Sequence, residues 1–139
     1  PWLDLFADGL GAWRQQHGTW TIADGVVRGR DDHGGKVRLI GRTPVGDVEV
    51  DCEIRITGST HGEIQVGDYN WFFTLPASGA WTRIHLRQQG QGLTCTADGR
   101  PLVAEAEAGA GAPMRPGPLS FYGGIGATVE IRQARIRIP

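Results

Sequence analysis

The sequence predicts an all-β domain in which two antiparallel sheets pack face to face. Short runs of alternating apolar and polar residues recur along the whole chain, and turns rich in glycine separate them. Glycine accounts for 22 of the 139 residues, well above its usual share of about 7%. No helical pattern separates the runs, and this combination is typical of a β-sandwich or a β-barrel.

The first part of the chain contains several short predicted strands. One lies at residues 3–5, and a second begins at Trp13. Residues 19–28 contain two strands around Asp24-Gly25, a pair typical of a two-residue hairpin turn. Residues 36–40 form a further strand.

Residues 47–57 give the clearest strand prediction. Five apolar residues occupy every second position, so they lie on one face, and charged residues fill the positions between them. Such a strand is expected to be half-buried. Its charged positions are Glu49, Asp51, Glu53 and Arg55.

The same alternation continues to the end of the chain. In the last run, the apolar positions change parity, which predicts a β-bulge near Gln133-Ala134. Residues 104–112 are expected to form a loop, because Gly109 and Gly111 interrupt a weak helical pattern. The predicted strands are 63–66, 69–75, 81–88, 93–97, 101–103, 119–122 and 128–138.

Length and charge restrict the possible classes of protein. A chain of this length is expected to form one domain, residues 1–139, with a single core. Lys and Arg number 14 against 15 Asp and Glu, a net charge of -1, which argues against a partner that is a nucleic acid. No run approaches the ~20 apolar residues of a membrane helix, so no membrane insertion is expected.

Six local patterns, taken in order, resemble the 3-keto-disaccharide hydrolase domain family, long called a domain of unknown function. The resemblance spans nearly the whole chain, although no single pattern would be sufficient. The patterns are Leu5-Phe6-x-Asp8-Gly9-Leu10-x-x-Trp13, Trp20-x-Ile22-x-Asp24-Gly25-Val26-Val27-x-Gly29, Gly46-Asp47-Val48-Glu49-Val50-x-x-Glu53-Ile54-Arg55, Gly79-x-Trp81-x-Arg83-Ile84, Thr96-x-Asp98-Gly99-x-Pro101-Leu102 and Val129-Glu130-Ile131-x-x-x-Arg135-Ile136.

This resemblance implies a concanavalin A-like or laminin G-like jelly roll with one flat or convex sheet and one concave sheet. It also implies association with glycans, in a bacterial protein with an extracellular or periplasmic location. Family members carry longer loops over the concave face, whereas the connections between residues 58 and 90 are short here, which argues against catalysis. Four tryptophans follow the core positions of the family and are expected to pack inside: Trp2, Trp13, Trp20 and Trp81.

Glu49, Asp51 and Glu53 form the strongest catalytic candidate. The pattern is similar to the Glu-x-Asp-x-Glu strand of laminarinase-type glucanases. Residues two apart on a strand are about 6.6–6.8 Å apart, and a retaining glycosidase needs its two carboxyl groups at roughly 5–5.5 Å. The alternative is a solvated strand face, which we favour because the charged row continues to Arg55.

Aromatic residues at positions 69–73 are the strongest binding signal. On a strand, Trp71 and Phe73 share one face and Phe72 takes the other, so one of the two faces is core and the other exposes aromatic surface. An exposed ring can form a platform for a sugar. Alternatively, the aromatics fill both sheets of a small sandwich. The predicted ligand-binding residues, expected on neighbouring strands, are Tyr69, Trp71, Arg83, His85, Arg87, Glu63 and Gln65, with Asp68 beside them.

Metal and thiol chemistry receive little support. The four histidines lie in separate segments, and the one polar cluster that suggests a cation site is Asp31, Asp32 and His33. A surface loop explains this cluster equally well, so neither a metal nor another cofactor is expected. Cys52 and Cys95 alternate in phase with apolar residues, which predicts buried, unreactive thiols. Two free thiols are favoured over a disulfide bridge between them.

Three functions remain open from the sequence. We favour a non-catalytic glycan-binding or interaction module of a larger protein, with its ligand on the concave sheet. The second is a glycosidase or lyase that acts on 3-keto or related glycosides through Glu49, Asp51 or Glu53. The third is a structural or assembly domain that buries exposed aromatics against a partner. The expected partner is therefore a carbohydrate or a protein.

Overall fold

The protein folds into two antiparallel β-sheets that pack against each other. The computed structural model describes residues 1–67, 71–107 and 113–139. The described residues form fourteen strands and no helix. They therefore contain no helix that is long and apolar enough to cross a membrane. The predicted all-β sandwich is confirmed.

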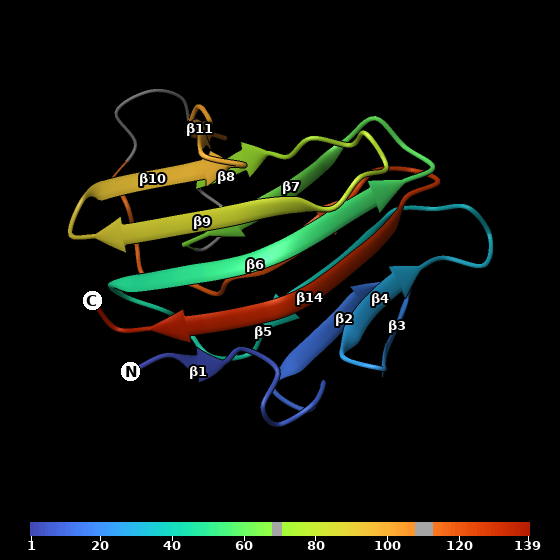
Figure 1. Ribbon diagram of the computed structural model, residues 1–139, viewed down its shortest axis with the longest axis horizontal. Coiled ribbons are helices and arrows are strands. Elements are labelled where there is room, and N and C mark those ends of the chain that lie inside the picture. The colour runs from blue at the N-terminus through green and yellow to red at the C-terminus, as the bar shows by residue number, and fades with distance from the viewer. Residues whose placement is uncertain (68–70, 108–112) are drawn as a thin grey trace.

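The larger sheet has the strand order β11-β10-β9-β6-β14-β4-β3, with β1 paired to β14 (Figure 1). The two chain ends lie near each other because β1 runs alongside β14. Its strands are β1 (Leu3–Asp4), β3 (Thr19–Ala23), β4 (Val26–Arg30), β6 (Val48–Thr57), β9 (Thr82–Gln89), β10 (Gly92–Ala97), β11 (Arg100–Pro101) and β14 (Thr128–Arg137).

The smaller sheet lies behind the larger one in Figure 1 and has the order β12-β8-β7-β13-β5-β2. Consecutive strands along the chain often lie in different sheets, so the chain crosses between the layers several times. The strands are β2 (Trp13–His17), β5 (Val37–Gly41), β7 (Gly62–Val66), β8 (Trp71–Thr74), β12 (Glu105–Ala106) and β13 (Ser120–Gly123).

The hydrophobic core lies between the two sheets. The alternating apolar side chains of β6 point inward, as predicted, and are all nearly inaccessible to solvent. From the smaller sheet, Ile64, Phe73 and Phe121 occupy the centre of the layer and are at most 1% exposed. These two sets of inward side chains hold the sheets together, and each sheet keeps one outer face for other interactions.

The tight turns and the bulge agree with the sequence predictions. Asp24-Gly25 connects β3 to β4, and both residues have positive φ (53° and 74°), as a two-residue hairpin turn requires. In β14, the register with β6 shifts between Arg132 and Arg135, and Gln133 has a φ of 50°. The predicted bulge near Gln133-Ala134 is confirmed.

The predicted core packing is wrong for two of the four tryptophans. Trp13 and Trp20 are buried in the core, but Trp2 and Trp81 are not part of it. Both lie against arginine side chains of the larger sheet instead.

The prediction of a loop at 104–112 is wrong in part. This segment contains the short strand β12, whose Glu105 pairs with Phe72 at the sheet edge. Residues 108–112 of that prediction lie outside the described residues.

Candidate functional site

The predicted ligand-binding residues do not form one site. Arg83, His85 and Arg87 lie on β9 of the larger sheet, whereas Glu63 and Gln65 lie on β7 of the smaller sheet. The expectation that these strands are neighbours is wrong, because the chain changes sheets between β8 and β9. Tyr69 and Asp68 lie outside the described residues.

Trp71 packs against the core, and Phe72 takes the outer face of the smaller sheet. Trp71 shares its face with Phe73, which is fully buried opposite Ile64. Phe72 is the cross-strand neighbour of Gln65 and is partly exposed. Phe72 is therefore a partly exposed aromatic on the outer face of this sheet, whereas Trp71, which the sequence favoured for binding, faces inward.

Gln65 is the centre of a polar network on the outer face of the smaller sheet. Its Oε1 accepts hydrogen bonds from Arg38 Nη2 at 2.5 Å and from Ser120 Oγ at 2.8 Å. Its Nε2 donates to Glu63 Oε1 at 2.9 Å. Gln65 and Ser120 are buried although they face away from the core. The network therefore fixes the geometry of the groups around it.

His61 and Tyr122 extend this network toward solvent. His61 Nε2 lies 2.5 Å from Glu63 Oε2, and the ring of His61 meets that of Tyr122 edge to face with centroids 5.8 Å apart. The His61 side chain is 46% exposed and that of Glu63 is 12% exposed. We call the whole set the polar cluster, and it consists of Arg38, His61, Glu63, Gln65, Ser120 and Tyr122.

Strand pairing explains why these residues meet. In the register of β13, Ser120 lies opposite Gln65 on one side, and Tyr122 lies between Glu63 and Arg38. Glu63 and Gln65 were predicted as ligand residues from the sequence, whereas the other four members of the polar cluster were not. The sequence did contain a signal for three of them. Arg38, Ser120 and Tyr122 alternate with inward apolar residues of β5 and β13, and this alternation places their side chains on the outer face.

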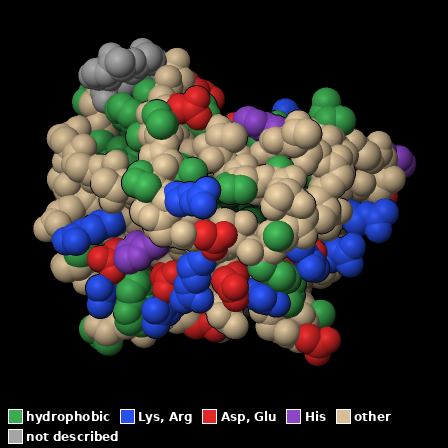
Figure 2. Space-filling view, turned by 45° about the horizontal axis from the view of Figure 1, so that its top comes forward, with side chains coloured by type: hydrophobic (Ala, Val, Ile, Leu, Met, Phe, Trp, Pro, Cys, Tyr) green, Lys and Arg blue, Asp and Glu red, His purple; other side chains and the backbone are tan. Residues whose placement is uncertain are grey.

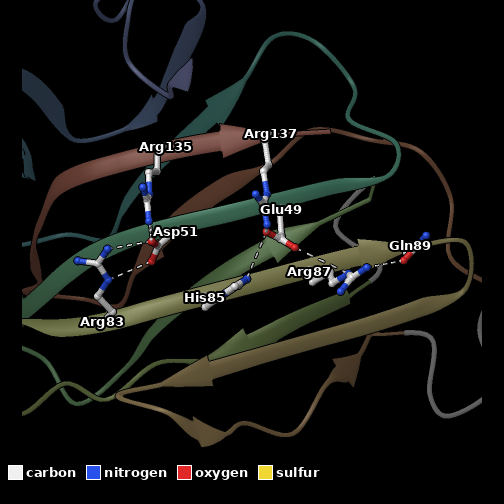
Figure 3. Close-up of polar contacts among 8 residues, drawn as sticks. All are labelled: Glu49, Asp51, Arg83, His85, Arg87, Gln89, Arg135 and Arg137. Carbon is white, nitrogen blue, oxygen red and sulfur yellow. Dashed lines mark hydrogen bonds and ion pairs between the residues drawn. The ribbon is translucent and has the colours of Figure 1, made fainter. Parts of the chain in front are cut away.

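The outer face of the larger sheet has a different organisation, in which acidic residues of β6 lie between basic residues of β9 and β14. Asp51 accepts hydrogen bonds from Arg83 Nη2 and Arg135 Nη2, each at 2.8 Å (Figure 3). Glu49 accepts from Arg137 Nε at 2.8 Å, and His85 Nε2 lies 3.7 Å from it.

The same pattern continues along β6. Glu53 pairs with Arg132 and Arg55 pairs with Glu130, and basic and acidic side chains are gathered over this sheet in Figure 2. We call the whole array the arginine ladder. It consists of Glu49, Asp51, Glu53, Arg55, Arg83, His85, Arg87, Glu130, Arg132, Arg135 and Arg137.

The acidic row of β6 does not resemble a glycosidase pair. Burial raises the pKa of Asp51, but hydrogen bonds and charges from Arg83 and Arg135 outweigh this effect, so its pKa is lowered overall. A general acid needs the opposite shift. The expected solvated face is wrong for Glu49 and Asp51, which as whole residues are only 4% and 6% exposed beneath the arginines, whereas Glu53 is partly exposed.

Two tryptophans flank the arginine ladder. Trp81 lies under the guanidinium groups of Arg55 and Arg132, whose Cζ atoms are 4.7 Å and 3.9 Å from its ring. Trp2 contacts Arg135 and Arg137 at 4.4 Å and 4.3 Å. Both rings therefore stabilise the ladder through cation–π contacts.

The remaining candidates show little reactive chemistry. The carboxylate of Asp31 accepts a hydrogen bond from the Gly35 N–H at 2.6 Å, and no group of three or more His, Cys, Asp or Glu able to hold a metal occurs within the described ranges. Cys52 and Cys95 are free and buried, as favoured from the sequence. Burial raises the pKa of both thiols, that of Cys95 to about 12.

Comparisons with known proteins identify the fold. No protein-family model matches the sequence, and a search of curated proteins finds no match either, so the resemblance to the 3-keto-disaccharide hydrolase family stays a prediction. Among solved structures, a candidate glycosyl hydrolase from Parabacteroides distasonis superposes with a TM-score of 0.79 at 14% identity, over 100% of both chains.

Two further structures have a known relation to sugars. A carbohydrate-binding module from Bacillus subtilis matches with a TM-score of 0.64 at 14% identity, over 88% of this chain and 93% of that one. The exoplasmic/lumenal domain of VIP36, in its Ca2+/Man-bound form, matches with a TM-score of 0.62 at 11% identity, over 99% and 89%. The chain thus has the jelly-roll fold of carbohydrate-binding modules and lectins.

Proposed function

We propose that the protein is a non-catalytic carbohydrate-binding module, part of a larger protein, that holds a neutral glycan on the outer face of the smaller sheet. The polar cluster carries this proposal. In this proposal the smaller sheet takes the role of the concave, ligand-facing sheet that the family resemblance implies. The likeness to a carbohydrate-binding module and to a lectin-like domain supports it at the level of the fold.

The polar cluster offers the chemistry that sugar hydroxyl groups need. A hydroxyl both donates and accepts a hydrogen bond, so it is best held between a donor and an acceptor. Arg38 provides N–H donors, Glu63 provides carboxylate acceptors, and His61 provides a ring nitrogen beside them. Because Gln65 fixes these groups in place, little conformational entropy is lost when a ligand binds.

Two aromatic side chains complete the proposed site. Phe72 and Tyr122 lie on the same outer face as Gln65, on strands to either side of β7, and both are partly exposed. An aromatic ring contacts the apolar face of a pyranose, while the polar cluster contacts its edge. Partly exposed aromatic surface beside hydrogen-bonding groups is a common feature of binding sites.

Titration calorimetry against a panel of neutral oligosaccharides tests the proposal. We expect binding to at least one member and about tenfold weaker affinity in Tyr122→Ala and in Phe72→Ala, a change of about 1.4 kcal/mol each. Arg87→Ala, on the opposite face, is the matched control and should bind as the wild type does. Absence of binding across the panel, or equal losses in the control, would contradict the proposal.

The catalytic alternative has its best support at His61 and Glu63. Their 2.5 Å contact resembles the pairing of an imidazole with a carboxylate in general acid–base catalysis, and it lies within the polar cluster. If the protein is a glycosidase or lyase of 3-keto glycosides, Glu63→Gln should abolish turnover, whereas Glu49→Gln should not. A wild-type protein that binds a keto-glycoside without converting it excludes this alternative.

A further inference from the structure

The outer face of the larger sheet exposes cations above buried anions. Arg83, Arg87, Arg135 and Arg137 have side chains that are between 42% and 50% exposed. The side chains of Glu49 and Asp51, which lie beneath them, are only 6% and 9% exposed. We call these four arginines the arginine row. With four positive charges over two negative ones, the accessible layer carries an excess of positive charge (Figure 3).

Some N–H donors of the arginine row are not bound to Glu49 or Asp51. Arg135 binds Asp51 through Nε and Nη2, so its Nη1 has no hydrogen bond to that carboxylate. Arg87 is held more loosely, with Nε 3.9 Å from Glu49 and Nη2 donating to Gln89 Oε1 at 2.8 Å. A guanidinium group presents several N–H donors in a planar fork, which matches the geometry of a carboxylate. An incoming carboxylate can therefore bind without displacing Glu49 or Asp51.

A hollow lies at one end of the arginine row. It has a volume of about 390 Å³, and its lining includes Trp2, Arg83, Gln133 and Arg135. The hollow is shallow and open to solvent, so it would cover one side of a bound sugar and leave the other side in water. Asp4 also lines it, with its carboxylate accepting the Phe6 N–H at 2.8 Å. The hollow thus combines an apolar indole wall with two guanidinium groups.

We propose that this face is a second binding site, for a polysaccharide that carries uronate groups. Carboxylates of the polymer pair with exposed N–H groups of the arginine row, and one sugar ring lies in the hollow against Trp2. The modest excess of positive charge on this face and the overall net charge of -1 favour an acidic glycan over a nucleic acid. This site is independent of the one proposed on the smaller sheet, which takes neutral sugars.

Calorimetry with oligogalacturonate and with its methyl ester tests the inference, because esterification removes the charge and keeps the sugar backbone. We expect the acid form to bind, the ester to bind at least about tenfold more weakly, and the affinity to fall as salt is added. Arg87→Gln and Trp2→Ala should each weaken binding about three- to tenfold. Neither side chain belongs to the core, so both variants should fold.

Tyr122→Ala provides the control on the smaller sheet, and it should bind oligogalacturonate as the wild type does. Equal affinity for the acid and the ester, no binding of either, or unchanged affinity in Arg87→Gln would overturn the inference. Tighter binding of a single-stranded DNA oligomer than of oligogalacturonate would also overturn it. Since the neutral-sugar panel measures a different face, the two proposals succeed or fail separately.

Discussion

The two outer faces of the sandwich use polar residues in opposite ways. On the larger sheet, acidic side chains of β6 are enclosed by arginines of β9 and β14, so their charges are neutralised within the protein. On the smaller sheet, a buried amide, Gln65, organises a mixed set of donors and acceptors, and the half-exposed His61 stands at the edge of that set. The anions of the first face are therefore expected to stabilise the fold, and we propose that the second face binds hydroxyl groups.

The largest expected effect is on stability, from the centre of the arginine ladder. Asp51→Ala removes an acceptor shared by Arg83 and Arg135, and we expect it to lower the free energy of unfolding by about 2–3 kcal/mol. Urea denaturation measures this loss. Glu105→Ala, at an exposed edge, is the control and should change stability by less than about 0.5 kcal/mol. A similar loss of unfolding free energy in Asp51→Ala and Glu105→Ala would contradict a special role of the buried anions in stability.

The contribution of Asp51 should also depend on pH. Because its pKa in the folded protein is lowered from 3.8, ionised Asp51 stabilises the fold above that value, and this contribution is lost as the pH falls through the lowered pKa. The difference in unfolding free energy between wild type and Asp51→Asn should therefore be constant near neutral pH and shrink below about pH 4. A difference that stays constant into acid would show that Asp51 acts through packing alone.

A smaller effect on stability is expected at the centre of the polar cluster. Gln65→Met keeps the side-chain size but removes the partner of Ser120 Oγ and Arg38 Nη2, and we expect a loss of about 1–2 kcal/mol. The same variant should also bind the neutral glycan more weakly than the wild type does. If Gln65→Met loses stability but keeps full affinity, the cluster is structural, and the ligand site lies elsewhere.

The smallest effect is expected at the cysteines. Because burial raises the pKa of Cys52 and Cys95, neither thiol should react with a thiol reagent in the native protein. Both should react once the protein is unfolded in urea, since they form no disulfide. Rapid labelling of the native protein would show that the core opens to solvent.

Local patterns were sufficient to predict the strands and turns. The alternation in β6, the Asp24-Gly25 turn and the bulge at Gln133 each depend on neighbouring residues, so they are visible in the sequence. Sheet membership is different, because it depends on pairings between distant segments. For this reason Glu63 and Arg83 were expected together, although they lie on opposite outer faces.

Burial of the acidic row was hidden for the same physical reason. The alternation of β6 predicts that Glu49 and Asp51 point outward, which is correct, but not what covers them. The cover comes from arginines on β9 and β14, distant in sequence. Likewise, the two-residue spacing of Trp71 and Phe73 showed that they share one face of the strand. Only the pairing of Phe73 with the buried Ile64 identifies that face as the one toward the core.

The central claim is that a neutral glycan binds the outer face of the smaller sheet. Nuclear magnetic resonance of the isotope-labelled protein, titrated with the neutral oligosaccharide that the panel selects, tests it directly. We expect the largest shift changes at the Gln65 side-chain amide and at the backbone amides of Ser120 and Tyr122. Shift changes centred on Asp51 and Arg83 instead, with the Gln65 amide unmoved, would contradict the account.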